Sequence, residues 1–172
     1  MENPTSNQVQ SHISKLGYYQ VIGGALGIVL IFFTALQNDS FTILVVFIYL
    51  FMCLAFVYSV LCGMLCLKKK EKALKFSLIN QILQLVGFAV LGYAFQYAAG
   101  VYLTVGVDLT KSINMDLGFG ISKFNFNFNH EKEKLEFDFN LVALVLIYWI
   151  DKLMNKVKEE KDAVIMSSVG DA

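Results

Sequence analysis

The longest apolar stretch of the chain covers residues 41–67 and contains no charged side chain. It is followed at once by a cluster of four lysines and one glutamate at residues 68–72. A helix needs roughly 20 apolar residues to cross ~30 Å of hydrocarbon, and a lysine at mid-membrane costs about 2.5–3.5 kcal/mol. The stretch is therefore expected to span a membrane, with the lysines held at one surface.

Three further apolar runs predict three further spanning helices. Residues 18–36 are too long for the apolar region of a signal peptide and lack a small-residue cleavage site. A third helix is expected from Ala73 to about Ala99, and a fourth from the run 137–150, extended to Met154. The predicted fold class is membrane α-helical, a four-helix transmembrane bundle.

The pattern changes between the third and fourth runs, where apolar and polar residues alternate as they do in strands. Three or four antiparallel strands are expected here, with the hairpin 121–129/134–140 as the clearest. We expect this small extracytoplasmic β cap, inserted between helices three and four, to lay its apolar face over the mouth of the bundle. Alternatively, Phe124, Phe126 and Phe128 form a surface that docks another envelope protein by strand addition.

Lysine positions predict the orientation. Ten of the fourteen lysines lie in the N-terminal segment, the 68–75 loop and the tail after residue 150. The positive-inside rule places these parts in the cytoplasm, and therefore predicts a multi-pass protein of the plasma (inner) membrane with both termini inside. The expected parts are a cytoplasmic segment (1–17), helices one to three (18–100), the β segment (101–138), helix four (139–154) and a cytoplasmic tail (155–172).

Two small groups of residues within the predicted spans are candidates for helix contacts or a ligand pocket. Asn80, Gln81 and Gln84 are amides two to three turns inside the third helix, where such side chains usually bond a neighbouring helix, with a ligand or ion contact as the alternative. Gly23 and Gly27 form a G-x-x-x-G pair that lets another helix approach closely, either within the bundle or in a homodimer.

Composition narrows the function classes. Only 16% of the residues are charged, against about 25% in soluble domains, the formal net charge is zero and arginine is absent, so nucleic-acid binding is not expected. The two histidines fall on opposite sides of the predicted membrane, and the three cysteines lie together in 41–67 without a histidine or carboxylate. No catalytic motif, metal site or cofactor site is expected.

The opening LGYYQVIGG (Leu16–Gly24) and the closing FNLVALVLIYWIDKL (Phe139–Leu153) resemble small uncharacterised four-span bacterial inner-membrane proteins. That resemblance implies a bacterial plasma membrane and carries no activity to any residue. The layout of spans also resembles that of tetraspanins, but the outer segment lacks the Cys-Cys-Gly motif of that family.

Two functions remain open from the sequence. The first is a non-enzymatic scaffold or accessory subunit of an envelope assembly, with the lipid bilayer and another envelope protein or a second copy as partners. The second is a small-molecule channel, carrier or sensor with a polar pocket at Asn80, Gln81 and Gln84.

Overall fold

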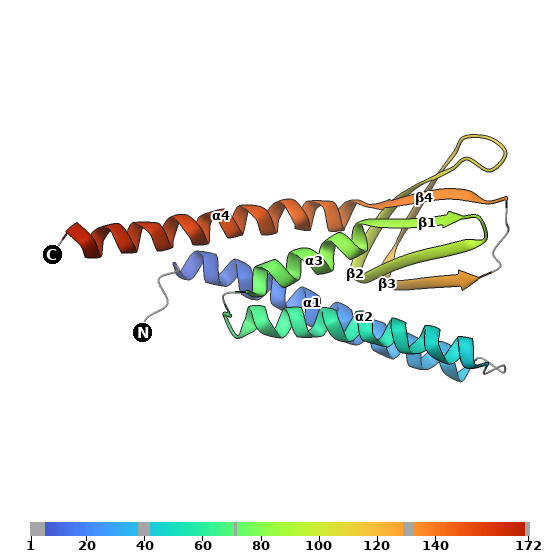
Figure 1. The fold of residues 1–172 in the computed structure, drawn as a ribbon, viewed down its shortest axis with the longest axis horizontal. Helices are drawn as coiled ribbons and strands as arrows, with labels where there is room; N and C mark the ends of the chain where they lie inside the picture. The colour runs from blue at the N-terminus through green and yellow to red at the C-terminus, as the bar shows by residue number, and fades with distance from the viewer. Residues whose placement is uncertain (1–5, 38–41, 71, 129–132, 171–172) are drawn as a thin grey trace.

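The computed structural model describes residues 6–37, 42–70, 72–128 and 133–170. Four helices and one four-stranded sheet follow each other along the chain (Figure 1). Their bounds are α1 (Asn7–Leu36), α2 (Ile43–Leu67), α3 (Ala73–Leu85), β1 (Val86–Val90), β2 (Tyr93–Asp108), β3 (Asn114–Phe128), β4 (Leu135–Asn140) and α4 (Leu141–Gly170).

Helices α1 and α2 form a long antiparallel hairpin. Ser6 and Thr42 cap the two helices, their hydroxyls accepting the amide hydrogens of Val9 and Val45. Glycines let the helix backbones touch, because a β-carbon on Gly63 would lie only 2.5 Å from the carbonyl oxygen of Gly17. Such close packing allows extensive van der Waals contact between the two helices.

The expected third span, 73–99, is wrong. Helix α3 ends at Leu85, and the chain continues as β1, a tight turn at Leu91 and Gly92 with positive φ, and β2. The break at Leu85 has little signature in the sequence, because residues 86–95 contain no charged or amide side chain from which to tell a period of 3.6 from a period of 2.

The four-span helical bundle is also wrong. Among the described residues only α1 and α2 are long and apolar enough to cross a membrane as helices. The fourth predicted helix, 139–154, is the first half of α4, which begins at Leu141, where Asn140 caps it, and runs on to Gly170 as one helix (Figure 1). Because its second half is charged, the described part of α4 contains no apolar stretch of 18 residues, the length that a helix needs to cross a membrane.

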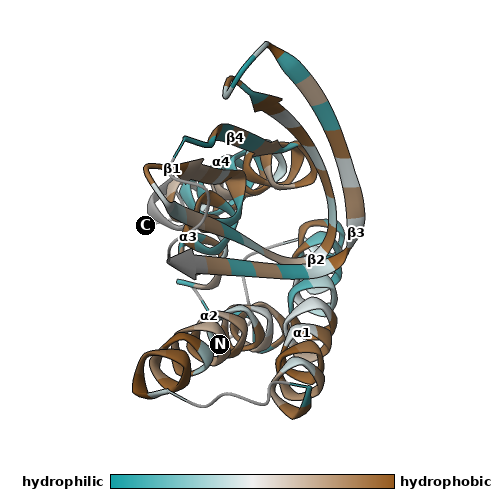
Figure 2. Ribbon diagram, turned by 90° about the vertical axis from the view of Figure 1, so that its right-hand side faces the viewer, coloured by the Kyte–Doolittle hydropathy of each residue, from teal (hydrophilic) through white to brown (hydrophobic). Residues whose placement is uncertain are grey.

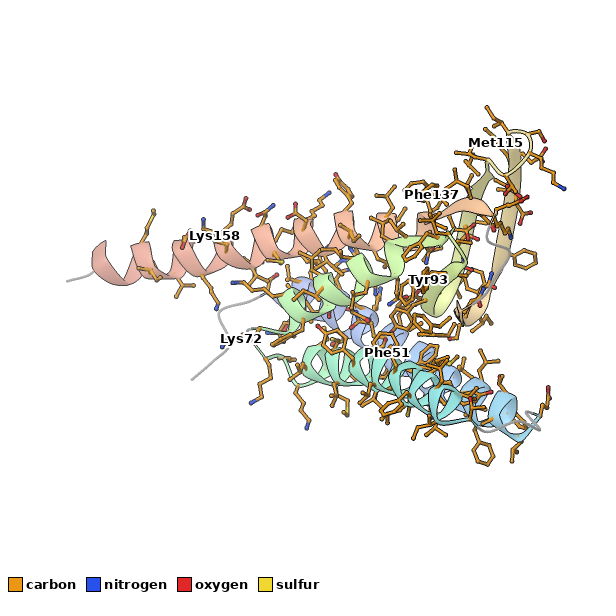
Figure 3. All side chains as sticks on the ribbon, turned by 45° about the vertical axis from the view of Figure 1, so that its right-hand side comes forward. Phe51, Lys72, Tyr93, Met115, Phe137 and Lys158 are labelled. Carbon is orange, nitrogen blue, oxygen red and sulfur yellow. The ribbon has the colours of Figure 1, made fainter. Side chains whose placement is uncertain are left out.

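The sheet is antiparallel throughout, in the order β1-β4-β2-β3, with β1 also pairing with the start of β2. The predicted 121–129/134–140 hairpin does not form, because β3 pairs with β2 and β4 lies between β1 and the end of β2. β2 and β3 bend together where the register shifts between Ala98 and Val101, and both Gly100 and Ser122 have positive φ there. Beyond the bend, residues 101–121 form an arm that extends away from the helices (Figures 1 and 3).

The close contact between α1 and α2 can be tested at Gly63. Replacing Gly63 by Val should destabilise the hairpin by about 1–3 kcal/mol, because the new side chain meets backbone atoms that cannot move aside. The control is Leu61→Val on the exposed face of the same helix, which should change stability little. Equilibrium unfolding in mixed micelles measures both, and equal effects would contradict the packing.

Candidate functional site

Two polar regions lie inside this largely apolar molecule. One is a buried cluster of amides and hydroxyls where α1, α2 and α3 meet β2. The other is a polar chamber lined by the sheet and partly open to the surroundings. Both regions depend on side chains brought together from distant parts of the chain.

Asn80 is the centre of the buried cluster. Its side-chain amide donates to the Ser59 hydroxyl at 3.1 Å, and its carbonyl oxygen accepts from the Tyr97 hydroxyl at 3.3 Å. Tyr97 is also within 2.8 Å of the carbonyl oxygen of Ala55. Asn80 and Ser59 are fully buried. The side chain therefore links α3 to α2 and to the sheet through groups that have no access to water.

Gln20 and Ser77 extend this cluster to α1. The Ser77 hydroxyl donates to the side-chain oxygen of Gln20 at 2.9 Å, and the Ser59 hydroxyl donates to the backbone oxygen of Gln20 at 3.2 Å. The Cys66 thiol lies 3.2 Å from the Ser77 hydroxyl. Cys66 and Cys62 are buried free thiols in this packing.

Gln81 and Gln84 are buried beside Asn80 but are bonded differently. The Gln84 oxygen accepts the backbone amide hydrogen of Ala99 at 2.7 Å, which ties α3 to the bend in β2. Both polar atoms of Gln81, and the nitrogens of Gln84 and Gln20, are buried without a hydrogen-bond partner among the described residues. A buried polar group left in this way costs about 1–3 kcal/mol. The predicted pocket residues Asn80, Gln81 and Gln84 thus lie together, and the cluster contains hydrogen-bond donors and one acceptor that bond no described residue.

The glycine pair packs inside the chain. A β-carbon on Gly23 would collide with the backbone of Gly100, and one on Gly27 would collide with the ring of Phe56. Gly23 thus admits the bent strand β2 and Gly27 admits a side chain of α2. For the G-x-x-x-G pair the sequence allowed either a contact within the bundle or a homodimer contact, and the structure shows both glycines in contacts within the molecule.

The phenylalanines expected to form a partner surface face α2. The ring of Phe124 lies 6.2 Å from that of Phe51 and 6.4 Å from that of Phe56, and the ring of Phe126 lies 6.0 Å from that of Phe51. The side chain of Phe128 lies outside the described residues. Phe124 and Phe126 are half-buried in this way because α2 supplies the nearest apolar surface.

The chamber is a cavity of about 180 Å³ inside the bent sheet. Charged side chains reach it from β3 and β4, and Lys134 pairs with Glu136 at 2.5 Å. Its lining consists of Phe88, Ala89, Ala94, Phe95, Gln96, Thr104, Asp116, Gly118, Lys123, Asn125, Lys134, Glu136 and Asp138. The alternation in the sequence located these polar residues on one face, but gave no sign that the sheet would curl around that face.

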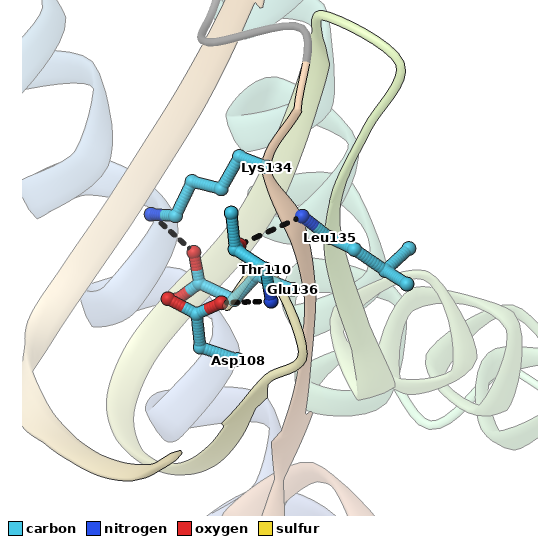
Figure 4. Close-up of polar contacts among 5 residues, drawn as sticks. All are labelled: Asp108, Thr110, Lys134, Leu135 and Glu136. Carbon is cyan, nitrogen blue, oxygen red and sulfur yellow. Dashed lines mark hydrogen bonds and ion pairs between the residues drawn. The ribbon is translucent and has the colours of Figure 1, made fainter. Parts of the chain in front are cut away.

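A polar turn borders the chamber (Figure 4). The Asp108 carboxylate accepts the amide hydrogen of Thr110 at 2.8 Å, and the Thr110 hydroxyl accepts the amide hydrogen of Leu135 at 3.1 Å. Hydrogen bonds from Thr110 hold the pKa of Asp108 below its ordinary value. A second cavity of about 230 Å³ lies beside this turn and shares Lys134 with the chamber.

In the described part of the chain no three histidine, cysteine, aspartate or glutamate side chains converge on a point where a metal ion could sit. His12 packs edge-on against Trp149, with ring centroids 5.8 Å apart, far along the chain from the chamber.

Comparisons of the chain with protein-family models, with curated proteins and with solved structures give no match.

Asn80 and Gln81 make a matched pair for testing the buried cluster. Asn80→Leu should destabilise the protein by about 1–3 kcal/mol, because Ser59 and Tyr97 lose their partner in a buried site. Gln81→Leu should be neutral or stabilising, because it removes two polar atoms that bond no described residue. Unfolding in mixed micelles compares the two, and equal losses would show that Gln81 has a bound partner.

The Asp108 turn should weaken in acid. A depressed pKa means that ionised Asp108 stabilises the folded state above the unfolded value, about 3.8, and that this contribution is lost as the pH falls through the lower, folded value. The stability difference between wild type and Asp108→Ala should therefore be largest near neutral pH and shrink below the unfolded pKa. A difference that stays constant from pH 7 to strong acid would contradict the assignment.

Proposed function

We propose that the protein is a non-enzymatic integral membrane protein whose α1–α2 hairpin crosses the bilayer. The observation that supports this most directly is the surface of the hairpin. Phe32 is 62% exposed and Phe47 is 63% exposed, and only 28% of the apolar window of α1 and 17% of that of α2 are buried, unlike those of a core helix in a soluble protein. Such a large exposed apolar surface requires an apolar medium.

The dimensions of the hairpin agree with this role. The 25 residues of α2 measure about 37 Å at 1.5 Å per residue, which exceeds the hydrocarbon thickness of ~30 Å. The exposed lysines after α2, the N-terminal end of α1 and the charged half of α4 lie toward the same end of the molecule (Figure 1). By the positive-inside rule we place that end, with both chain termini, in the cytoplasm of a bacterial cell.

Within the membrane we assign the protein the role of a scaffold or accessory subunit of an envelope assembly. Among the strands that the structure describes, β3 pairs only with β2, so its second edge offers backbone donors and acceptors to another strand. Strand addition at such an edge is a common way to bind a partner or a second copy.

A second candidate is a carrier or sensor of a small polar solute. The spare donors of Gln20, Gln81 and Gln84 in the buried cluster favour it, because a solute or water would bond atoms that the described residues leave unpaired. Solute flux into liposomes, compared between wild type and Gln81→Leu, separates this candidate from the first. Flux that is absent, or that Gln81→Leu leaves unchanged, would remove it.

The main proposal is tested by extraction and purification. The protein should remain with membranes after an alkaline carbonate wash and enter solution only with detergent, because the hairpin surface is apolar. Gentle purification with a C-terminal tag should recover a stoichiometric partner or a homo-oligomer. Release by carbonate would contradict the membrane assignment, and a strictly monomeric, partner-free species would contradict the subunit role.

A further inference from the structure

The polar face of the sheet lines the chamber, and much of its apolar face points outward, which is the reverse of the arrangement in a soluble protein. Around the arm, Thr104, Asp116 and Gly118 line the chamber, while their neighbours Leu117 and Phe119 point the other way. Figure 2 shows the alternation as bands along β2 and β3. A small barrel in water fills its interior with apolar side chains. Polar-in and apolar-out alternation is instead the pattern of sheets in membranes.

The outward side chains of the arm are among the most exposed apolar residues of the protein. Phe119 is 86% exposed, Met115 is 80% exposed and Leu117 is 72% exposed. Ile113 and Ile121 continue the same row, so that the exposed surface is contiguous along β3. An uncovered row of this kind marks an interaction with a membrane or a protein.

The position of the sheet distinguishes between these two occupants. The sheet lies beside the distal part of the α1–α2 hairpin, to which Phe124 and Tyr97 attach it through Phe51 and Phe56 (Figures 1 and 3). Phe51 lies about 24 Å along α2 from the lysine end, which is within the ~30 Å of hydrocarbon that the hairpin would cross. The sheet is thus anchored at the depth of acyl chains.

The apolar surface is also continuous over the short elements that enter and leave the sheet. Ile82 and Leu83 on α3 and Leu144 and Val145 on α4 are exposed, as is Phe139 at the end of β4. The helix hairpin, the two helix segments and the sheet therefore present one apolar exterior.

We propose that acyl chains of the bilayer cover the outward face of the sheet, so that the chamber is a polar compartment held within the depth of the membrane. This inference rests on the proposed membrane crossing of α1 and α2. If the sheet lies in hydrocarbon, the outer edge of β3 should pair with a strand of a partner, because unpaired backbone groups in hydrocarbon cost several kcal/mol each. The side-chain face is assigned to lipid and the backbone edge to the partner.

Tryptophan fluorescence in liposomes tests the proposal on the full-length chain. The chain has one tryptophan, so Trp149→Phe provides a silent background. Phe119→Trp places the probe on the outward face of the arm, and Phe47→Trp places it on the hairpin as a matched control for lipid contact. Phe124→Trp is the control for a half-buried position against α2. Each variant is reconstituted with ordinary or with brominated phospholipids, and iodide is added as the aqueous quencher.

Brominated lipids should quench the probes at 119 and 47 to a similar extent, and iodide should quench neither, while the probe at 124 responds less to both. If the probe at 47 responds to brominated lipid but the probe at 119 responds to iodide, the sheet lies in water and this inference fails while the membrane anchor stands. If the probe at 119 resists both quenchers, a second copy or another protein covers the face, and the inference also fails. If neither 47 nor 119 responds to brominated lipid, the proposed membrane crossing itself fails.

Discussion

The junction where β2 and β3 bend against α1 sets the position of the sheet relative to the α1–α2 hairpin. The Ser122 hydroxyl donates to the backbone oxygen of Gly23 at 2.9 Å and accepts the amide hydrogen of Gly100 at 3.1 Å. Gly100 has a positive φ, and neither it nor Gly23 has room for a β-carbon. The Tyr19 hydroxyl adds a 2.8 Å bond to the Val101 oxygen. This junction fixes the sheet beside the hairpin, and so places the chamber and the buried amides in one body.

The buried amides are the second connection between the helices and the sheet. Asn80 bonds Ser59 and Tyr97, and Gln84 accepts the backbone amide hydrogen of Ala99, all at positions that are buried from water. A hydrogen bond in such a buried site stabilises the fold, because losing one partner leaves the other polar group unpaired rather than bonded to solvent. The polar atoms of Gln81 and the side-chain nitrogens of Gln20 and Gln84, which bond no described residue, are exceptions to this rule, and departures of that kind in a native structure point to an additional bound species or to strain.

Charged and apolar side chains are separated in space. Charged residues gather at the lysine end, along the second half of α4, at the turn of Asp108 and Thr110, and inside the chamber, while α1, α2 and the outward face of the sheet expose apolar side chains. Lys134 and Glu136 form an ion pair at the chamber, where both side chains remain partly exposed.

The sequence by itself determined two long helices joined by a short turn, because residues 18–36 and 41–67 are apolar runs without a charged side chain. It did not show that α1 begins at Asn7, eleven residues before the apolar run. It also revealed the alternation of the strands and singled out the three α3 amides that meet in the buried cluster.

The sequence could not determine that the helix after Ala73 stops at Leu85. Both faces of Val86–Val90 are apolar or small, and only pairing with β4 and β2 supplies the hydrogen bonds that make this segment a strand. Nor could it tell which face of the sheet turns inward, since alternation has the same period for either choice. That was decided by tertiary contacts: the bend at Gly100 and Ser122 curls the sheet around its polar side, and α2 receives Phe124 and Phe126 on the other.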